Sequence, residues 1–226
     1  MGSCYVFCAG ACGALLSPPG PGDCILAADG GLAHVQCLGL TPDRIVGDFD
    51  SLGYIPGDAR VYPVEKDDTD AMLCARMGLE MGFRRFLFYG ALDGPRLDHT
   101  VANFQTLEFL AERGAVGYLV GTQYLATVLR DGELCFRAGC RGIVSVFCLG
   151  ADAEDVCIRG LHYPLEHGRL TAGYPLGVSN HFQDGPARIR VGRGSLLVLW
   201  DVENGLPAGR VQADGSQMEK DGKVEP

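Results

Sequence analysis

Short apolar runs recur through the first half of the chain, and most of them end in glycine or in a carboxylate. Runs of about four to eight apolar residues bounded by turn residues are typical of buried strands. The expected strands cover residues 4–8, 24–28, 45–46, 60–64, 86–89 and 116–120. Apolar residues at helical spacing lie between them, over residues 32–38, 71–82 and 98–113. Strands that alternate with helices predict a mainly parallel α/β sheet that is covered on both faces.

Two details of the expected helices can be checked against a structure. Thr69 or Asp67 is placed to cap the helix over 71–82, since both side chains can accept a hydrogen bond from a free backbone N–H. The helix over 98–113 should turn one apolar face inward. Its expected inward-facing residues are Val101, Phe104, Leu107 and Leu110.

The pattern changes after about Gln123, where helical spacing disappears. Short segments follow at the spacing of β-hairpins, separated by glycine turns. The expected strands cover residues 133–138, 143–149, 155–158, 161–165, 188–191 and 195–200. This favours a second, all-β domain built as a small sandwich. We therefore expect an α/β domain over 1–125, a β-sandwich over 126–205 and a disordered tail over 206–226, which is polar and charged.

Composition limits the classes of partner. The chain has 226 residues, of which 47% are hydrophobic and 21% charged, and its formal net charge is -9. An acidic protein is poorly suited to a nucleic-acid backbone, and no apolar run reaches the roughly eighteen residues that span a bilayer. The ten cysteines form no C-x-x-C pair, so free thiols in a reducing cytoplasm are the simpler interpretation.

A pair of carboxylates follows the third expected strand. Gly47 is succeeded by Asp48 and Asp50, with one residue between them. On an extended segment these two side chains point the same way, and like charges held together favour a cation between them. Oxygen ligands from few residues suit Mg²⁺, which keeps several waters and is shared with substrate phosphates. Solvated aspartates at the end of a strand are the alternative.

Other acids and one unusual lysine gather at neighbouring strand ends. Asp29 and Gly30 follow the second strand, where open α/β sheets place ligand contacts, although Asp29 could equally be a helix cap. Lys66 precedes a run of acids that includes Asp67 and Asp70, whose ordinary explanation is the helix dipole. The chain has only three lysines against sixteen arginines, and the other two are near the C-terminus. Lys66 is therefore a candidate for contact with a phosphate.

The fifth strand opens into a glycine loop that leads to a helix start. Arg96, Asp98, His99 and Asn103 lie there. A glycine loop before a helix start is an anion-binding arrangement, and a guanidinium fits phosphate oxygens in a bidentate manner. As a single residue, His99 is more often structural than catalytic.

Taken together, the motifs resemble those of the thiamine pyrophosphokinase family. The resemblance runs from about residue 5 to residue 201, and the five motifs occur in the same order. They are Ala28-Asp29-Gly30-Gly31, Gly47-Asp48-Phe49-Asp50-Ser51, Lys66-Asp67-Asp68-Thr69-Asp70, Arg96-Leu97-Asp98-His99 with Asn103, and Gly177-Val178-Ser179-Asn180. The family implies an N-terminal α/β nucleotide-binding domain, a C-terminal β-sandwich and a homodimer with its site between subunits. It also implies ATP and thiamine as substrates, with Mg²⁺ as cofactor and thiamine diphosphate and AMP as products.

The resemblance also implies a role for each matching residue. Asp48, Asp50, Asp67 and Asp70 would hold Mg²⁺ on the triphosphate. Asp29, Gly30, Arg96, His99 and Asn103 would surround the nucleotide. Tyr163, Ser179 and Asn180 would contact thiamine, since an aromatic face suits the thiazolium cation. Lys66 and Arg96 would neutralise the charge that develops on the phosphates. Asp98 is the first candidate for a general base, and His99 is the second.

Two alternatives start from the same residues. The strand with Asp48 and Asp50 also resembles that of haloacid-dehalogenase-type phosphatases, in which the first aspartate is phosphorylated. These proteins usually carry Thr or Val where this chain has Leu52, and they lack the β-sandwich. The other alternative is a thiamine or nucleotide sensor without catalysis. A P-loop kinase is excluded, because the chain has no G-x-x-x-x-G-K-[ST] motif.

Overall fold

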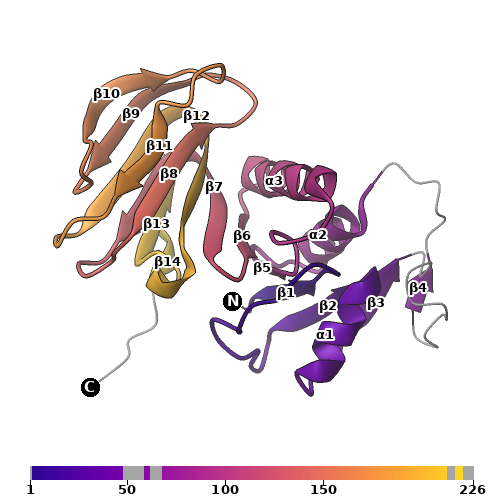
Figure 1. Ribbon diagram of the computed structural model, residues 1–226. Helices are drawn as coiled ribbons and strands as arrows, with labels where there is room; N and C mark the ends of the chain where they lie inside the picture. Colours follow the sequence, from indigo (N-terminus) through magenta and orange to yellow (C-terminus); the bar gives the residue numbers. More distant parts are fainter. Residues whose placement is uncertain (1, 48–58, 62–67, 213–216, 221–226) are drawn as a thin grey trace. The chain divides into compact units, whose positions relative to one another are not determined.

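The chain divides into two compact units, residues 1–123 and 124–226 (Figure 1). The computed structural model describes residues 2–47, 59–61, 68–212 and 217–220. Strands alternate with helices in the first unit, whereas the described residues of the second unit form strands and one 3-10 turn. The expected mixed α/β fold is therefore confirmed.

The described strands of the first unit form a parallel ladder. They are β1 (Cys4–Phe7), β2 (Cys24–Ala28), β3 (Arg44–Gly47), β4 (Ala59–Val61), β5 (Arg85–Tyr89) and β6 (Val116–Val120). Their order across the ladder is β4-β3-β2-β1-β5-β6, and each neighbouring pair is parallel. Every residue of β1, β2 and β6 is buried. Their continuous apolar runs are explained by this burial on both faces of the sheet.

The strand order reverses between β1 and β5. The chain builds outward from β1 through β2 and β3 to β4, then returns to the other side of β1 for β5 and β6. The loops that follow β1 and β5 therefore leave the sheet beside each other at its carboxyl edge. Such a switch point is where open α/β sheets bind ligands.

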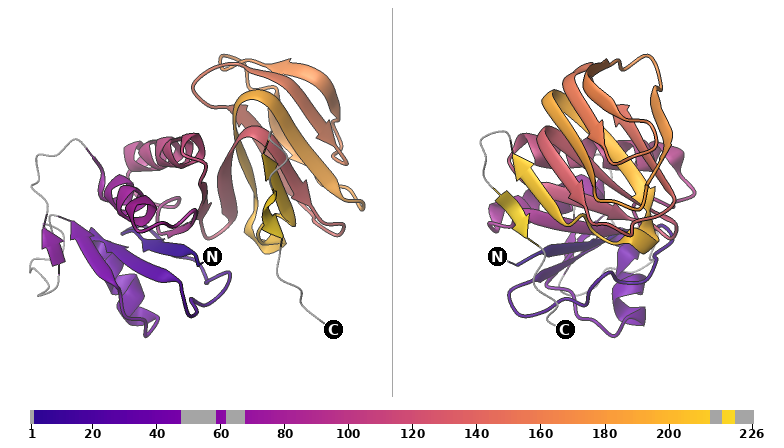
Figure 2. Two further views of the ribbon diagram at one scale, coloured as in Figure 1. Left: turned by 180° about the vertical axis from the view of Figure 1, so that it is seen from behind. Right: turned by 90° about the vertical axis from the view of Figure 1, so that its left-hand side faces the viewer.

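Helices cover the sheet on both sides. The helical elements are η1 (Asp29–Gly31), α1 (Leu32–Cys37), α2 (Asp70–Glu80) and α3 (Leu97–Glu112). Figures 1 and 2 show α2 and α3 on one face of the sheet and α1 on the other. The helix α3 follows the loop after β5 at the carboxyl edge of the sheet, and the first turns of α2 and α3 both border the switch point.

Thr69 is the residue that caps α2. Its backbone is extended, and its Oγ1 accepts the N–H of Met72 at 3.2 Å. Replacing Thr69 by alanine leaves that N–H without its cap, so we expect a loss of about 1 kcal/mol in the free energy of unfolding. Urea denaturation measures the change. Thr69→Ser keeps the hydroxyl and should restore most of the stability, and equal midpoints for Thr69→Ala and the wild type would contradict the cap.

The buried face of α3 differs in part from its predicted face. Leu107 and Leu110 are buried as expected, together with Asn103 and Thr106. Val101 is 51% exposed and does not pack inward. The buried face of the helix instead includes Asn103, whose amide donates to the carbonyl of Ala91. Val101 therefore lies on the exposed side of the first turns.

The second unit is antiparallel throughout its described strands. They are β7 (Tyr124–Phe136), β8 (Ile143–Cys148), β9 (Ala153–Arg159), β10 (Leu165–Leu170), β11 (Gly177–His181), β12 (Ala187–Asp201), β13 (Gly209–Gln212) and β14 (Gln217–Lys220), with the 3-10 turn η2 (Val202–Asn204). The long strand β12 pairs with β7 along its whole length. Its first half also pairs with β9 and its second half with β8, with a register shift between Val191 and Ser195. Trp200 and Phe136 meet edge to face, 5.3 Å between ring centroids, in the core of the unit.

Several segments of this unit differ from the sequence prediction. The strand expected over 133–138 begins at Tyr124, and the strands expected over 188–191 and 195–200 form the single strand β12. The strand expected over 161–165 lies instead at Leu165–Leu170, and within 161–164 only Leu161 forms a β-bridge, with Phe182. The strand at Gly177–His181 was not predicted. Both strands have irregular register, and most of their residues are exposed or half-buried, so neither shows the alternation of apolar residues that marks a strand in a sequence.

The tail expected to be disordered from residue 206 is ordered over Gly209–Gln212. This segment is β13, which pairs with β7. Arg210 is buried, and its guanidinium donates to the carbonyl of Val128 at 2.7 Å and to Thr127 Oγ1 at 3.4 Å. A polar segment is therefore held here by main-chain pairing and by acceptors for the arginine, which composition does not reveal.

All ten cysteines are free, and Cys37 at the end of α1 is exposed. Among the described residues, no helix has the length and apolar character needed to cross a bilayer.

Candidate functional site

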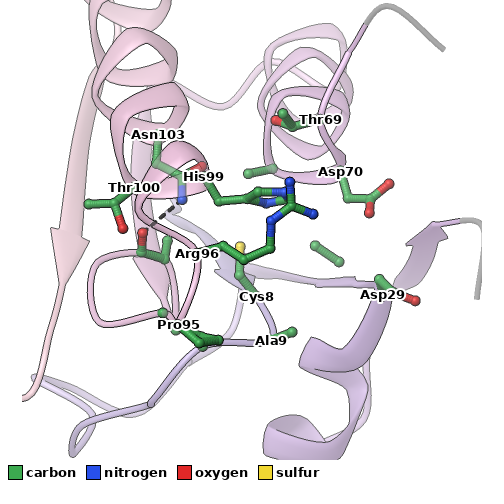
Figure 3. Close-up of a pocket in the computed structure, with 16 residues that line it drawn as sticks. Cys8, Ala9, Asp29, Thr69, Asp70, Pro95, Arg96, His99, Thr100 and Asn103 are labelled. Atoms are coloured by element: carbon green, nitrogen blue, oxygen red, sulfur yellow. Dashed lines mark hydrogen bonds between the residues drawn. The ribbon is translucent and has the colours of Figure 1, made fainter. Parts of the chain in front are cut away.

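A pocket of about 330 Å³ lies at the switch point of the first unit (Figure 3). It is bordered by the loops that follow β1, β2 and β5 and by the first turns of α2 and α3. The lining residues that carry polar side chains are Cys8, Asp29, Thr69, Asp70, Arg96, His99, Thr100 and Asn103. The remainder are glycine, alanine and proline, so backbone groups form much of the wall.

Glycines let the β1 and β5 loops touch at the lip of this pocket. The N–H of Gly10 donates to the carbonyl of Gly90 at 2.9 Å, and that of Cys8 donates to Tyr89 at 2.8 Å. A Cβ at Gly10 would lie 2.5 Å from the Gly90 oxygen, and Gly90 has a φ of 67°. Neither position therefore accepts a side chain without moving backbone.

Two side-chain hydrogen bonds hold the first turns of α3 against the loop that follows β5. Asn103 is buried and donates its amide to the carbonyl of Ala91 at 2.7 Å, the dashed line in Figure 3. One turn earlier, Thr100 Oγ1 donates to the carbonyl of Leu92 at 3.2 Å. These bonds fix the helix start against the loop, so Asn103 positions the site from underneath as well as lining it.

Arg96 and Asp98 form a bidentate ion pair at the start of α3. Arg96 Nε donates to Asp98 Oδ1 at 3.2 Å, and a second guanidinium nitrogen donates to Oδ2. The two side chains are 65% and 64% exposed. The hydrogen bonds from Arg96 lower the pKa of the Asp98 carboxyl, with a further contribution from the backbone N–H of His99. Asp98 is not among the residues that line the pocket, whereas Arg96 and His99 are.

This pairing makes a prediction about the pH dependence of the activity. A general base works above its pKa, and a lowered pKa makes a carboxylate a weaker proton acceptor at neutral pH. We therefore expect Asp98→Asn to reduce kcat/KM only by loosening Arg96, by less than about tenfold. The shape of the kcat/KM profile against pH should stay the same. If kcat/KM no longer fell at low pH in Asp98→Asn, this would instead show that Asp98 takes the proton.

The opposite side of the pocket carries the carboxylates. Asp29 follows β2 with a φ of 46°, and Asp70 begins α2. Figure 3 shows Arg96 and His99 projecting from α3 toward the space in front of Asp70. Between them, burial and then the charge of Asp70 raise the pKa of the Cys8 thiol to about 12, so Cys8 is neutral. The pocket thus presents acids on one side and a guanidinium on the other.

The structure brings together five of the site residues expected in the first domain. Asp29, Asp70, Arg96, His99 and Asn103 line one pocket. Gly30 lies in the adjoining 3-10 turn and is not a lining residue. Asp48, Asp50, Lys66 and Asp67 lie outside the described residues.

Sequence reasoning missed other lining residues, namely Cys8, Gly10, Thr69 and Thr100 as parts of the wall. A signal for the β1 loop was present, since Gly10 follows the first apolar run just as Gly30 and Gly90 follow later ones. Thr69 was expected as a cap, and the same hydroxyl group borders the pocket.

The second unit has a separate apolar pocket of about 340 Å³. It is lined by Ile158, Tyr163, Pro164, Leu165, Leu170, Leu176, Gly177, Val178 and Asn180. Tyr163 is 62% exposed and presents its ring at this pocket. Two of the three residues expected to contact thiamine, Tyr163 and Asn180, are therefore found together.

The contacts of Asn180 point to a structural role. Its side chain is buried, its Oδ1 accepts the N–H of Tyr163 at 2.9 Å, and its Nδ2 donates to the Tyr163 carbonyl at 2.8 Å. Oδ1 also accepts the N–H of His181. The amide thus clamps the backbone of Tyr163. Ser179 is exposed, with a φ of 56°, and is not among the residues lining this pocket.

The two pockets alone do not identify a protein family, whereas two family models match the chain. The model of the thiamin pyrophosphokinase catalytic domain matches residues 22–116, and that of the vitamin B1 binding domain of the same enzyme matches residues 136–196. Together they span well over half of the chain. This chain belongs to the thiamine pyrophosphokinase family. The first match contains both acids of the pocket and all of α3, and the second contains the Tyr163 and Asn180 pocket.

Individual thiamine pyrophosphokinases are distant in sequence but similar in fold. The thiamine pyrophosphokinase of Bacillus subtilis (strain 168) is 24% identical over 183 residues, which cover 77% of this chain and 85% of that protein. The solved thiamin pyrophosphokinase of Geobacillus thermodenitrificans is 26% identical with a TM-score of 0.71, covering 88% and 96% of the two chains. A solved family protein from Enterococcus faecalis is 23% identical with a TM-score of 0.75, covering 89% and 99%.

Proposed function

We propose that this protein transfers pyrophosphate from ATP to the hydroxyethyl group of thiamine, giving thiamine diphosphate and AMP. The observation that carries the proposal is the switch-point pocket, in which two carboxylates face a guanidinium at the start of a helix. Most of its lining residues, Asp29, Asp70 and Arg96 among them, lie within the segment that matches the catalytic domain of the family. The phosphatase and sensor alternatives gain no support, since both matching models describe thiamine pyrophosphokinase.

The donor set of the pocket fits a hard divalent cation. Asp29 and Asp70 supply carboxylate oxygens there, and Mg²⁺ is bound through one or two carboxylates together with substrate phosphates. We assign Asp70 as a Mg²⁺ ligand, together with the sequence candidates Asp48, Asp50 and Asp67. When bound, the ion would offset the negative charge of the triphosphate.

The chain's own residues then position the substrates and neutralise the charge of the phosphates. The start of α3 borders the pocket as a place for phosphate groups, and Arg96 is assigned to bind their oxygens. Lys66, a candidate from the sequence, is assigned the same task. The hydroxyl oxygen of thiamine bonds to the β-phosphorus, the bond to the bridging oxygen breaks, and AMP leaves with that oxygen. Because Asp98 is engaged by Arg96, His99 is the better-placed group to accept the hydroxyl proton.

We assign thiamine to the β domain expected over residues 126–205 and the nucleotide to the α/β domain expected over residues 1–125. The ring of Tyr163 offers a face to the thiazolium, and Asn180 acts by holding the Tyr163 backbone. Ser179, next to it in sequence, is the remaining polar contact. The family resemblance further supports a homodimer with its site between subunits, and the free thiols support a cytoplasmic location.

Tyr163 gives a direct test of the thiamine assignment. Tyr163→Ala should raise the KM for thiamine by about threefold to thirtyfold, the value of one cation–π contact, and leave the KM for ATP unchanged. Tyr163→Phe keeps the ring face and should stay close to the wild type. Tyr174→Ala is the matched control, because Tyr174 is also exposed, at 66%, and does not line this pocket. Equal effects of Tyr163→Ala and Tyr174→Ala would refute the assignment.

The reaction itself is tested by product analysis. Purified protein is incubated with thiamine, ATP and Mg²⁺, with controls lacking each component, and the nucleotides and thiamine esters are separated. We expect AMP and thiamine diphosphate in equal amounts. ADP with thiamine monophosphate would mean that the γ-phosphorus is attacked, and no thiamine-dependent product would overturn the proposal. Acyl phosphate trapped from a phosphomonoester would favour the phosphatase alternative.

A further inference from the structure

Three side chains of different chemistry converge on strands β9 and β10 of the second unit. Asp155 and Cys157 come from β9, and His167 comes from β10. A carboxylate oxygen, the thiol sulfur and an imidazole nitrogen all lie within 4.8 Å of one another. None of the three residues lines the switch-point pocket of the first unit or the apolar pocket that contains Tyr163.

The backbone is bent to bring these groups together. Asp155 has a φ of 53° and His167 a φ of 48°, the left-handed region that non-glycine residues rarely adopt. The pairing of β10 with β9 shifts register between Leu165 and Gly168, and His167 lies in that irregular stretch. Strained positions of this kind cost about 1–3 kcal/mol each and persist where the surroundings impose them, often at binding sites.

The existing contacts place the three groups as a ligand set. His167 Nδ1 is hydrogen-bonded to Asp155 Oδ1, and the backbone N–H of His167 donates to Cys157 Sγ at 3.4 Å. Arg190 holds the other carboxylate oxygen, Oδ2, at 2.9 Å. The sulfur thus lies within 4.8 Å of both Oδ1 and Nδ1, while Arg190 orients the carboxylate from outside, as outer partners of metal ligands do.

We propose that Asp155, Cys157 and His167 form a Zn²⁺ site. Thiolate, imidazole and carboxylate are the three ligand types that zinc takes in proteins, and three protein ligands leave one position for water. A hollow of about 50 Å³ borders Cys157 and His167 and has room for such a water. On binding, the ion replaces the hydrogen bond between His167 Nδ1 and Asp155 Oδ1, the neutral imidazole carries its proton on Nε2, and the Cys157 thiol releases its proton to solvent.

Nearby arginines do not prevent this. Arg159 is engaged by Glu166 in two hydrogen bonds of 2.8 Å, and Arg188 lies 3.6 Å from Glu133. Their charges are therefore offset by carboxylates. Arg190 also borders the hollow and shares the Asp155 carboxylate with the ion, so the thiolate and this carboxylate together offset part of the added charge.

An ion at this site would stiffen one wall of the apolar pocket that contains Tyr163. Zinc bound by residues of both strands links β10 to β9. Leu165 and Leu170, the two ends of β10, line the Tyr163 pocket. The role assigned to the ion is thus structural, and it does not depend on the proposed reaction.

Cobalt substitution tests the ligand set directly. Full-length protein stripped with a chelator is titrated with Co²⁺ in excess Mg²⁺, which occupies oxygen-only sites. We expect one Co²⁺ per chain, with a thiolate-to-cobalt charge-transfer band and tetrahedral visible absorption, both lost on adding one equivalent of Zn²⁺. Cys157→Ser should abolish the charge-transfer band. His167→Ala should weaken binding by more than about tenfold, the lower range for loss of even an outer partner.

Controls separate the site from other thiols and from misfolding. Cys148→Ser removes a half-buried strand cysteine elsewhere in the same unit and should keep the full spectrum. The His167 side chain is 69% exposed, so His167→Ala should fold normally, which circular dichroism checks. A charge-transfer band that survives in Cys157→Ser, full affinity in His167→Ala, or no thiolate band in the wild type would overturn the proposal.

Discussion

Asp70→Asn is expected to lower kcat by about 10²–10³-fold, the cost of removing one preorganised charge from a reaction centre. The change keeps the shape of the side chain and removes only its charge, which faces the pocket at the start of α2. The effect on folding should be small, because one carboxylate at a helix start contributes about 0.3–1 kcal/mol. Steady-state kinetics over a range of Mg²⁺ concentrations measure the loss.

Asp68→Asn is the matched control for this variant. Asp68 lies two residues earlier, is engaged by Arg76 at 2.9 Å and does not line the pocket. It should retain near-normal kcat. If Asp70→Asn also kept near-normal kcat at saturating Mg²⁺, the assignment of Asp70 as a metal ligand would be wrong. The same assay on Asp48→Asn tests the ligand that only the sequence suggests.

Arg96→Ala is expected to reduce kcat/KM for ATP by roughly tenfold to hundredfold, since a hydrogen bond to a charged group is worth about 1.5–3 kcal/mol. Arg96→Lys should recover only part of this loss, because an ammonium cannot bind two phosphate oxygens in a fork. Measuring the affinity for ATP and kcat separately shows whether Arg96 acts in binding or in turnover.

Arg84→Ala controls for the loss of one positive charge from the first unit. Arg84 is exposed and donates to the carbonyls of Phe83 and Leu79, away from the pocket. It should leave kcat/KM unchanged. Comparable losses in Arg84→Ala and Arg96→Ala would mean that net charge, and not the position of Arg96, explains the effect.

The sequence predicted well those parts that depend on local pattern. The parallel strands were visible because β1, β2 and β6 are buried on both faces and consist of unbroken apolar runs. The pocket residues Asp29, Asp70 and Arg96 could be grouped because polar residues at the carboxyl ends of parallel strands must meet at one edge of the sheet.

The features that the sequence did not reveal depend on contacts between distant segments. Asn180 was expected to contact thiamine, and the sequence did not reveal that its amide also holds the backbone of Tyr163, seventeen residues away. Val101 has the right spacing for the core, but the burial of Asn103 turns the helix elsewhere. Arg210 looked like part of a polar tail, since no local signal marks its acceptors on β7. In each case a side-chain hydrogen bond over a long sequence separation outweighs the local pattern.

The exposed thiol of Cys37 has a practical consequence for measuring the subunit state. Two molecules can be joined through this sulfur by air oxidation, whereas the other nine cysteines are buried or half-buried. A covalent pair on a non-reducing gel would therefore reflect storage conditions and not the proposed homodimer. Sedimentation should be run in fresh reductant or on Cys37→Ser, and a maleimide dye used in limiting amount would mark the end of α1 before any other position.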